Sequence, residues 1–215
     1  MFNRRPLLFF GFVVGSLCSI ASAKAQNVPP AAPVRPSIHQ LFLDDQNEGP
    51  RSDVSDQEHK RRGVLRRAQV REMLSKGEVQ SARDFHDASY LFQHGDTPDD
   101  YLLAHLLAIE AVIRGDASSK WMVAASLDRF LENTGRTQVF GTQYGPDPKL
   151  RTDPAEVAKH PYIGMTQAPF KTDLVPPIVR KDFCVPDLQQ QQENIKAFSK
   201  DIYPEATLVA PGCTR

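Results

Sequence analysis

Residues 101–113, with the sequence YLLAHLLAIEAVI, decide the fold class of this 215-residue chain. Their apolar side chains occur on every side of a predicted helix, and only His105 and Glu110 are polar. A helix that is apolar all round is covered by other elements on several sides. The stretch therefore predicts a buried helix inside a mainly helical domain, with His105 as a core histidine that makes one hydrogen bond.

Helix boundaries on both sides of this stretch are marked by glycines at intervals of 18, 20 and 20 residues. Glycine often follows the last turn of a helix, because it adopts the left-handed conformation at little cost. Ser55, Ser81 and Thr97 each stand three positions before an acidic residue, which is typical of a helix start, and Asp116 or Ser118 can cap a fourth helix. The predicted helices cover residues 53–76, 81–94, 98–114 and 118–134, and the glycines are Gly77, Gly95, Gly115 and Gly135.

The short connections between these helices predict how neighbouring helices run. Helices joined by short loops lie antiparallel. Two helices in each 38 to 40 residues is also the period of helical-hairpin repeats. The sequence thus predicts a mainly α fold of antiparallel helical hairpins, and both a small bundle and an α-solenoid-like stack fit the pattern.

The first 25 residues are typical of a secretory signal peptide. Arg4 and Arg5 precede an uncharged apolar stretch of 14 residues at positions 7–20, and Ala23-Lys24-Ala25 offers a cleavage site. A membrane-spanning helix needs about 20 apolar residues, so this stretch is short for an anchor. We therefore expect an exported protein, periplasmic or extracellular, with no membrane span after cleavage.

The distribution of prolines indicates three regions in the rest of the chain. Residues 26–50 contain five prolines and predict a flexible leader, in which an apolar patch at 38–43 is a candidate docking segment. Residues 51–145 form the predicted helical domain, which closes with a Gly-Thr-Gln turn. Residues 146–215 are a predicted extended, proline-rich C-terminal segment with one helix near 187–199.

Two cysteines remain after the predicted cleavage, Cys184 and Cys213. A pair of cysteines in an exported chain predicts one disulfide, and the alternative is two free thiols in a loose tail. In the chain-entropy model a bridge of this loop length stabilises the fold by roughly 3–4 kcal/mol.

Charge and motif content argue against several function classes. The full chain has 26 basic and 26 acidic residues, and the predicted mature chain has a net charge of −3, so nucleic-acid binding is not expected. No glycine-rich phosphate loop, Gly-x-Ser-x-Gly elbow or His-x-x-x-His pair occurs, so we expect no cofactor and no metal site. The basic residues of the helix at 53–76 are interpreted as a solvated face, the alternative being a site for an acidic partner.

Three short motifs stand apart from the helix pattern: Gln93-His94, Asp128-Arg129 and Gln138-Val139-Phe140-Gly141-Thr142-Gln143. Together they resemble the signature of an uncharacterised bacterial helical family, a domain of unknown function, over roughly residues 45–200. The family pattern, as it applies here, also has an upstream Asp-Gln followed by an arginine. Two candidates occur, Asp45-Gln46 with Arg51 and Asp56-Gln57 with Arg61. The resemblance implies a helical fold and a set of residues, and it implies no activity.

Asp128 and Arg129 have two interpretations. Adjacent helix residues diverge and do not pair with each other, so each needs its own partner. In the structural interpretation both hold the turn formed by Gln138, Gly141, Thr142 and Gln143 on the bundle. In the functional interpretation His94 and Asp128 form an acid–base pair, and Gln93, Arg129, Thr142 and Gln143 orient a ligand.

Two functions remain open at this point. The favoured hypothesis is a non-catalytic protein-interaction module with a partner in the cell envelope, which predicts an exposed apolar patch on the helices. The alternative is a small hydrolase-like or ligand-binding protein that uses the cluster of His94, Asp128 and the Gly-Thr-Gln turn. It requires His94 and Asp128 to meet at an open cleft.

Overall fold

The computed structural model describes residues 35–48, 53–200, 202, 208–210 and 213. The description below concerns the unit Pro36–Arg215. The predicted signal peptide and the first residues of the predicted leader lie outside the described residues. Among the helices that are described, none has the length and apolar character needed to cross a membrane.

The fold is mainly helical, as predicted. Helices α2 (Asp56–Ser75), α3 (Ala82–Gln93), α4 (Pro98–Ile113) and α5 (Lys120–Asn133) agree with the four predicted helices to within three residues at each end. The side chains of Ser55, Ser81 and Thr97 accept the capping hydrogen bonds that their spacing predicts. Asp116 caps a short 3-10 turn, η1 (Ala117–Ser119), that leads into α5. Local chemistry therefore sets these helix starts.

Three of the four glycine stops adopt the left-handed conformation, with φ of 68° at Gly77, 99° at Gly115 and 71° at Gly135. Gly95 has a different role. A Cβ atom at this position would collide with the side chain of Asp100 and with the carbonyl oxygen of Phe92. Glycine is needed there because two chain segments approach closely.

Part of the predicted flexible leader is helical. Helix α1 (Ile38–Asn47) begins after the last proline of the leader's first half, and Ser37 caps it by accepting from the backbone N–H of Gln40. Ile38 and Leu41 are buried against the helical core, so the apolar patch docks. The expectation of flexibility is wrong for this helix, because its apolar face outweighs the prolines that precede it.

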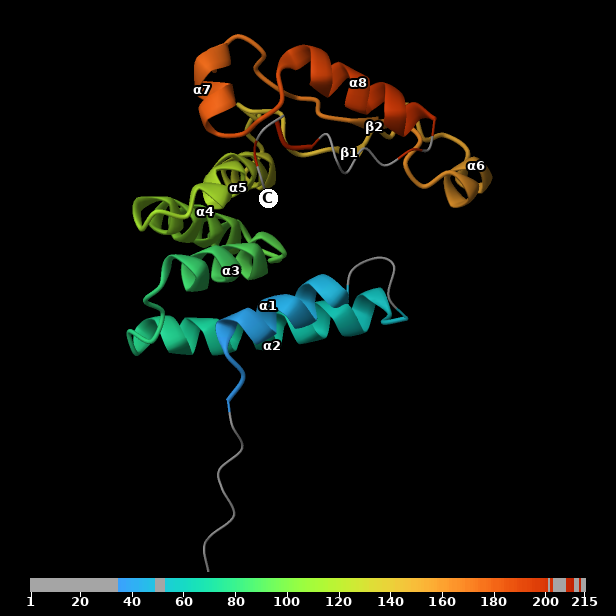
Figure 1. Cartoon of the computed structure of the whole chain (residues 1–215). Helices are drawn as coiled ribbons and strands as arrows, with labels where there is room; N and C mark the ends of the chain where they lie inside the picture. The colour runs from blue at the N-terminus through green and yellow to red at the C-terminus, as the bar shows by residue number, and fades with distance from the viewer. Residues whose placement is uncertain (1–34, 49–52, 201, 203–207, 211–212, 214–215) are drawn as a thin grey trace, which may run out of the picture. The chain divides into compact units, whose positions relative to one another are not determined.

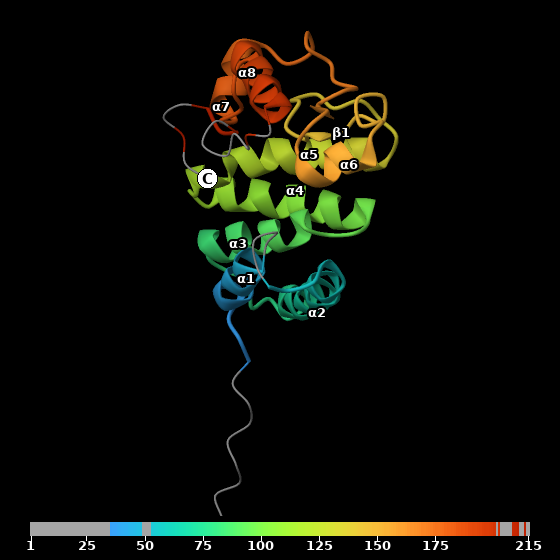
Figure 2. The same ribbon diagram turned by 90° about the vertical axis from the view of Figure 1, so that its right-hand side faces the viewer.

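The helices α3, α4 and α5 stack in succession, and α1 and α2 lie together on the side of α3 that faces away from α4 (Figures 1 and 2). Alanines at the contacts between α4 and its neighbours are fully buried, which lets the helix axes approach closely; they are Ala104, Ala108, Ala111, Ala124 and Ala125. Helix α4 is covered by α3 and α5, as expected, but Leu106 and Ile113 are 55% and 72% exposed, so one side of this helix is open.

The C-terminal part contains more structure than predicted. Helix α8 (Leu188–Ser199) is the predicted terminal helix. Two short helices, α6 (Pro154–Lys159) and α7 (Pro177–Asp182), and an antiparallel pair of two-residue strands, β1 (Gly145–Pro146) and β2 (Met165–Thr166), precede it.

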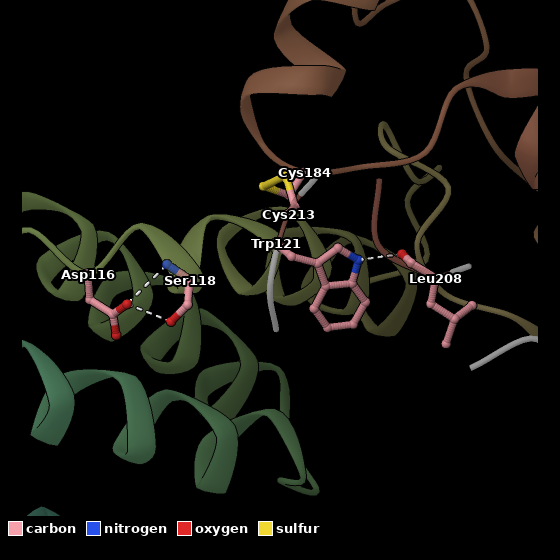
Figure 3. The surroundings of a disulfide bond; sticks show 6 residues. All are labelled: Asp116, Ser118, Trp121, Cys184, Leu208 and Cys213. Carbon is pink, nitrogen blue, oxygen red and sulfur yellow. Dashed lines mark hydrogen bonds between the residues drawn. A yellow bond between two sulfur atoms is a disulfide. The ribbon is translucent and has the colours of Figure 1, made fainter. Parts of the chain in front are cut away.

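A disulfide joins Cys184 and Cys213, with the Cα atoms 5.7 Å apart (Figure 3). The neighbouring chain at residues 208–210 is also held at two other points. The indole Nε1 of Trp121 donates to the carbonyl oxygen of Leu208 at 2.9 Å, and the backbone N–H of Ala210 donates to the carbonyl oxygen of Cys184 at 2.8 Å. Residues 208–210 are therefore held against Trp121 of α5 and against Cys184.

Candidate functional site

Asp128 organises the loop at residues 138–143. Its carboxylate has no exposed surface, and both oxygens accept from the loop. Oδ1 accepts from the backbone N–H groups of Val139 at 2.7 Å and Phe140 at 3.0 Å. Oδ2 accepts from the backbone N–H of Thr142 at 2.9 Å and from its hydroxyl at 2.8 Å. Four donors compensate the desolvation of the buried charge, so the structural interpretation of Asp128 is confirmed.

The carbonyl groups of the same loop are bound from the opposite side. The guanidinium of Arg180 donates to the carbonyl oxygen of Phe140 at 2.9 Å, and the amide of Gln191 donates to the carbonyl oxygens of Phe140 and Gly141. Gln167 also donates to Gly141. Burial lowers the pKa of Arg180, and the negative charge of Asp128 opposes this shift.

Gln138 and Gly141 complete the turn. The amide of Gln138 donates to the carbonyl oxygens of Gln143 and Gln167 at 3.0 Å, and its Oε1 accepts from the backbone N–H of Gln143 at 2.9 Å. Gly141 has φ of 67°, and a Cβ atom there would meet the ring of Phe170 at 2.8 Å. These two residues are structural, because their contacts hold the loop in shape and join it to residues 167–170.

His94 does not pair with Asp128, so the predicted acid–base pair is wrong. The physical reason is that the loop donors take both oxygens of Asp128. His94 instead caps the end of α3 and pairs with Asp45 of α1, with Nδ1 and Oδ2 2.6 Å apart. The side chain of Asp45 is 1% exposed, whereas that of His94 is 38% exposed. The pair therefore joins a buried acid to an accessible base.

Asp45 belongs to one of the two Asp-Gln candidates. The amide of Gln46 donates to Asp45 Oδ2 at 3.2 Å. The arginine beside Asp45 is Arg66, with Nη1 3.5 Å from Oδ1, and Arg66 also pairs with Glu48 at 2.6 Å. Arg51, the arginine proposed for this motif, lies outside the described residues.

The basic residues of α2 are only partly solvated. Arg66 and Arg67 are buried, and Arg67 donates to the carbonyl oxygen of His94 at 2.9 Å and pairs with Asp96. The solvated interpretation is wrong for these two arginines, because acids contributed by α1 and by the α3–α4 connection face them. Helix periodicity alone cannot reveal such partners.

A cleft of about 260 Å³ opens beside His94. Five of the eight residues predicted for the polar cluster line it, together with Gln46, and the other three hold the loop behind it. The polar lining residues are Gln46, Gln93, His94, Arg129, Thr142 and Gln143. The apolar and aromatic ones are Tyr90, Trp121, Met122, Tyr144, Met165, Phe198 and Leu208.

Arg129 holds two parts of the cleft wall together. Its Nε donates to Gln143 Oε1 at 2.8 Å, and its Nη1 donates to the carbonyl oxygen of Gln93 at 2.6 Å. Asp128 and Arg129 thus diverge to separate partners, as predicted. The side-chain oxygen of Gln93, a residue only 4% exposed, receives no hydrogen bond from any residue that the structure describes.

This arrangement is suited to proton transfer. A carboxylate bound to Nδ1 fixes the imidazole orientation and leaves Nε2 as the reactive nitrogen. Among the described residues, no serine or cysteine side chain lines the cleft, and the Thr142 hydroxyl is bound to Asp128. A base that acts on water or on a bound ligand therefore fits the site better than a covalent nucleophile does.

Two of the other histidines, His105 and His86, are structural by their contacts. His105 Nδ1 is 2.9 Å from the carbonyl oxygen of Val123, which confirms the predicted single hydrogen bond. His86 Nδ1 is 2.8 Å from the hydroxyl of Ser119. Burial lowers the pKa of both imidazoles. Within the described part of the chain, no group of three or more His, Cys, Asp or Glu side chains is placed to hold a metal ion.

Comparison of the chain with models of protein families, with curated proteins and with solved structures gave no match. The resemblance to a helical family therefore rests on the three short motifs.

Proposed function

We propose that this chain is an exported protein that binds a small ligand in the cleft beside His94, and that the His94–Asp45 pair transfers a proton to or from that ligand or a water molecule. The supporting observation is the 2.6 Å contact between an accessible imidazole and a buried carboxylate. The proposed class is ligand-binding or hydrolase-like, and Asp45 takes the role that was predicted for Asp128.

Export is supported by the signal-peptide pattern and by the Cys184–Cys213 bridge. Disulfides persist in oxidising compartments and are rare in the cytosol. Periplasmic or extracellular location thus remains part of the proposal.

The chain has a single tryptophan, Trp121, and it lines the cleft. The experiment is a fluorescence titration of the purified mature protein with a library of small polar and aromatic compounds, repeated on His94→Gln. We expect compounds that change Trp121 fluorescence in the wild type to bind at least about tenfold more weakly to the variant. The control is His160→Gln. His160 caps the end of the short helix α6 and does not line the cleft.

Turnover is tested with chromogenic ester and amide substrates. Asp45→Asn should lower kcat more than KM, because the buried acid orients the base rather than the ligand. Absence of any compound that alters Trp121 fluorescence or the melting temperature contradicts the proposal.

A second candidate function rests on the open side of α4. Leu102, Leu106 and Ile113 are exposed apolar residues that share one side of this helix. Such a stripe fits the protein-interaction module expected from the sequence. Affinity capture from the envelope fraction with wild type and Leu106→Glu tests it: a partner lost only in the variant supports the module, and identical captures count against it.

A further inference from the structure

We propose that Arg66 and Arg67 of α2 are positioning residues for proton transfer at the cleft. Arg66 orients the acid of the proton-transfer pair, Asp45, and Arg67 fixes the backbone of its base, His94. This inference rests on the proposed function and names the residues that set the geometry of its central pair. It does not depend on which ligand the cleft binds.

The contact between α1 and α3 contains two His–Asp pairs that run in opposite directions. His94, at the end of α3, binds Asp45 of α1. His39 of α1 binds Asp87 of α3, with Nδ1 and Oδ2 2.8 Å apart. In this second pair the imidazole is again the accessible member, 36% exposed against 2% for the acid. The two pairs are therefore alike in geometry and in burial.

The position of the neighbouring arginine distinguishes the two pairs. Beside His39 the arginine contacts the base, because Arg83 Nη2 is 3.1 Å from His39 Nε2. Beside His94 the arginine is on the far side of the acid, where Arg66 contacts Asp45. No described residue makes a hydrogen bond with Nε2 of His94. This nitrogen exchanges the proton when a carboxylate is bound at Nδ1, so the His94 pair is the reactive one of the two.

The guanidinium of Arg66 is itself held in place. Its Nη2 pairs with Glu48 at 2.6 Å, its Nη1 is 3.5 Å from Asp45 Oδ1, and its side chain is buried. Burial opposes the ionisation of Glu48, but hydrogen bonds from Arg66 and Arg62 lower its pKa below the ordinary value, so Glu48 is charged at neutral pH. Asp45 therefore has a fixed cation at Oδ1 and the imidazole of His94 at Oδ2, which restricts the orientation of the carboxylate.

Arg67 acts on the other member of the pair. Its Nη1 donates to the carbonyl oxygen of His94 at 2.9 Å, and its Nη2 pairs with Asp96. His94 directly follows the last residue of α3, where carbonyl groups lack partners within the helix. A buried guanidinium at this carbonyl oxygen fixes the backbone from which the imidazole extends. Consecutive residues of α2 thus hold the acid and the base of one pair.

The test is the NMR resonance of the Nδ1–H proton of His94 in the mature protein. A proton held between an imidazole and a buried carboxylate is shielded from exchange with water. We expect Arg66→Gln and Arg67→Gln to shift this resonance or to abolish it by exchange. The Nδ1–H resonance of His39 is the internal reference and should stay in place.

Arg62→Gln is the matched control. Arg62 lies one turn before Arg66 and pairs with the same Glu48 at 2.8 Å, but it contacts neither Asp45 nor His94. This variant should leave the His94 resonance unchanged. An unchanged His94 resonance in folded Arg66→Gln overturns the role of Arg66, and the same result in folded Arg67→Gln overturns the role of Arg67.

A measurement on His94→Gln covers the case in which the arginine variants do not fold. Coupling between two groups is reciprocal, so a change at His94 is transmitted through Asp45 to Arg66. The guanidinium N–H resonances of Arg66 should shift in His94→Gln, whereas those of Arg62 should stay in place. Arg66 resonances that do not move overturn the inference.

Activity separates this inference from the proposed function. If a substrate is turned over in an Asp45-dependent manner but Arg66→Gln and Arg67→Gln leave kcat and its pH profile unchanged, the inference fails and the proposed function stands. If the resonances respond as expected and no compound binds in the cleft, the proposed function fails, and the pair is still held as inferred.

Discussion

At the scale of single residues, the buried carboxylate of Asp128 is the strongest link between α5 and the loop that follows it. It accepts four hydrogen bonds from three loop residues, Val139, Phe140 and Thr142. Arg180 and Gln191 in turn bind carbonyl groups of the same loop. The conformation of the loop therefore depends on the negative charge of Asp128, which binds its N–H groups, and on the guanidinium and amide donors that bind its carbonyl groups.

Asp128→Asn tests this dependence. The substitution keeps the shape of the side chain but removes the charge and turns an NH₂ group towards backbone donors. We expect the free energy of unfolding to fall by about 3–5 kcal/mol, measured by urea denaturation. Asp173→Asn, at an exposed turn position, is the control and should change stability little. Equal stability of the two variants contradicts the structural role of Asp128.

We expect the half-buried imidazoles of His105 and His86 to make stability depend on pH. Burial lowers the pKa of His105 and of His86 below the ordinary value of 6.5. The unfolded chain therefore binds protons near pH 6.5 that the folded chain binds only at lower pH, so stability is lost as pH falls from about 6.5 towards the lowered pKa values. Urea midpoints at pH 7.5 and 5.5 should differ less in His105→Gln than in wild type. A larger difference in the variant contradicts the sign.

The hydrogen-bond partners of Asp128 can be predicted from the sequence, whereas the partner of His94 cannot. The partners of Asp128 lie within 14 residues along the chain, so they could be predicted as the nearest donors in the sequence. The partner of His94 lies 49 residues upstream, on a helix within a segment whose prolines indicated flexibility. Proline content is a local signal, and it does not report that Ile38 and Leu41 bury a side of α1.

At the level of the helices, capping residues and glycines predicted where α2 to α5 begin and end, because these signals act within one helical turn. Burial was predicted less well. The stretch at 101–113 is apolar on every side, yet α4 is covered by α3 and α5 and open at Leu106. Composition gives the number of apolar residues on a helix, but the positions of the other elements decide which of them are covered.

Leu107→Asp and Leu106→Asp form a matched pair on α4. Leu107 is 4% exposed and packs in the core, whereas its neighbour Leu106 is 55% exposed. The buried position should lose about 4 kcal/mol or more, because a charge enters an apolar contact and the packing of a leucine is lost. The exposed position should change by less than about 1 kcal/mol. Thermal unfolding of both variants checks this, and similar melting temperatures would be inconsistent with the packing of α4.

At the scale of the whole molecule, the C-terminal part was the least predictable. Its interior is rich in buried amide side chains, such as Gln167, Gln191 and Asn194, which read as surface residues in a sequence. Gln167 and Gln191 are buried because the loop at 138–143 offers backbone carbonyl groups that need partners, and Asn194 donates to the hydroxyl of Tyr144. Only the two cysteines gave a long-range constraint, and the structure joins them.

The disulfide lies close in the sequence to a residue of the cleft wall, Leu208. Leu208 lines the cleft and accepts from Trp121, and Cys213 is bonded to Cys184 after α7 (Figure 3). Cys213→Ser should lower the free energy of unfolding by roughly 3–4 kcal/mol. It should also shift Trp121 emission to longer wavelength, because release of the segment around Leu208 exposes the indole to water.

Chemical reduction of the wild type distinguishes the effect of losing the disulfide from other effects of the Cys213→Ser substitution. A reducing agent should reproduce both changes in wild type and have no effect on Cys213→Ser, since no disulfide is left to reduce. Ligand affinity in the cleft should fall together with the emission shift, because the same segment forms part of its wall. A reduced wild type that keeps its emission maximum and its stability would mean that Trp121 and Leu208 stay in place without the bridge, and that the tail is fixed by packing alone.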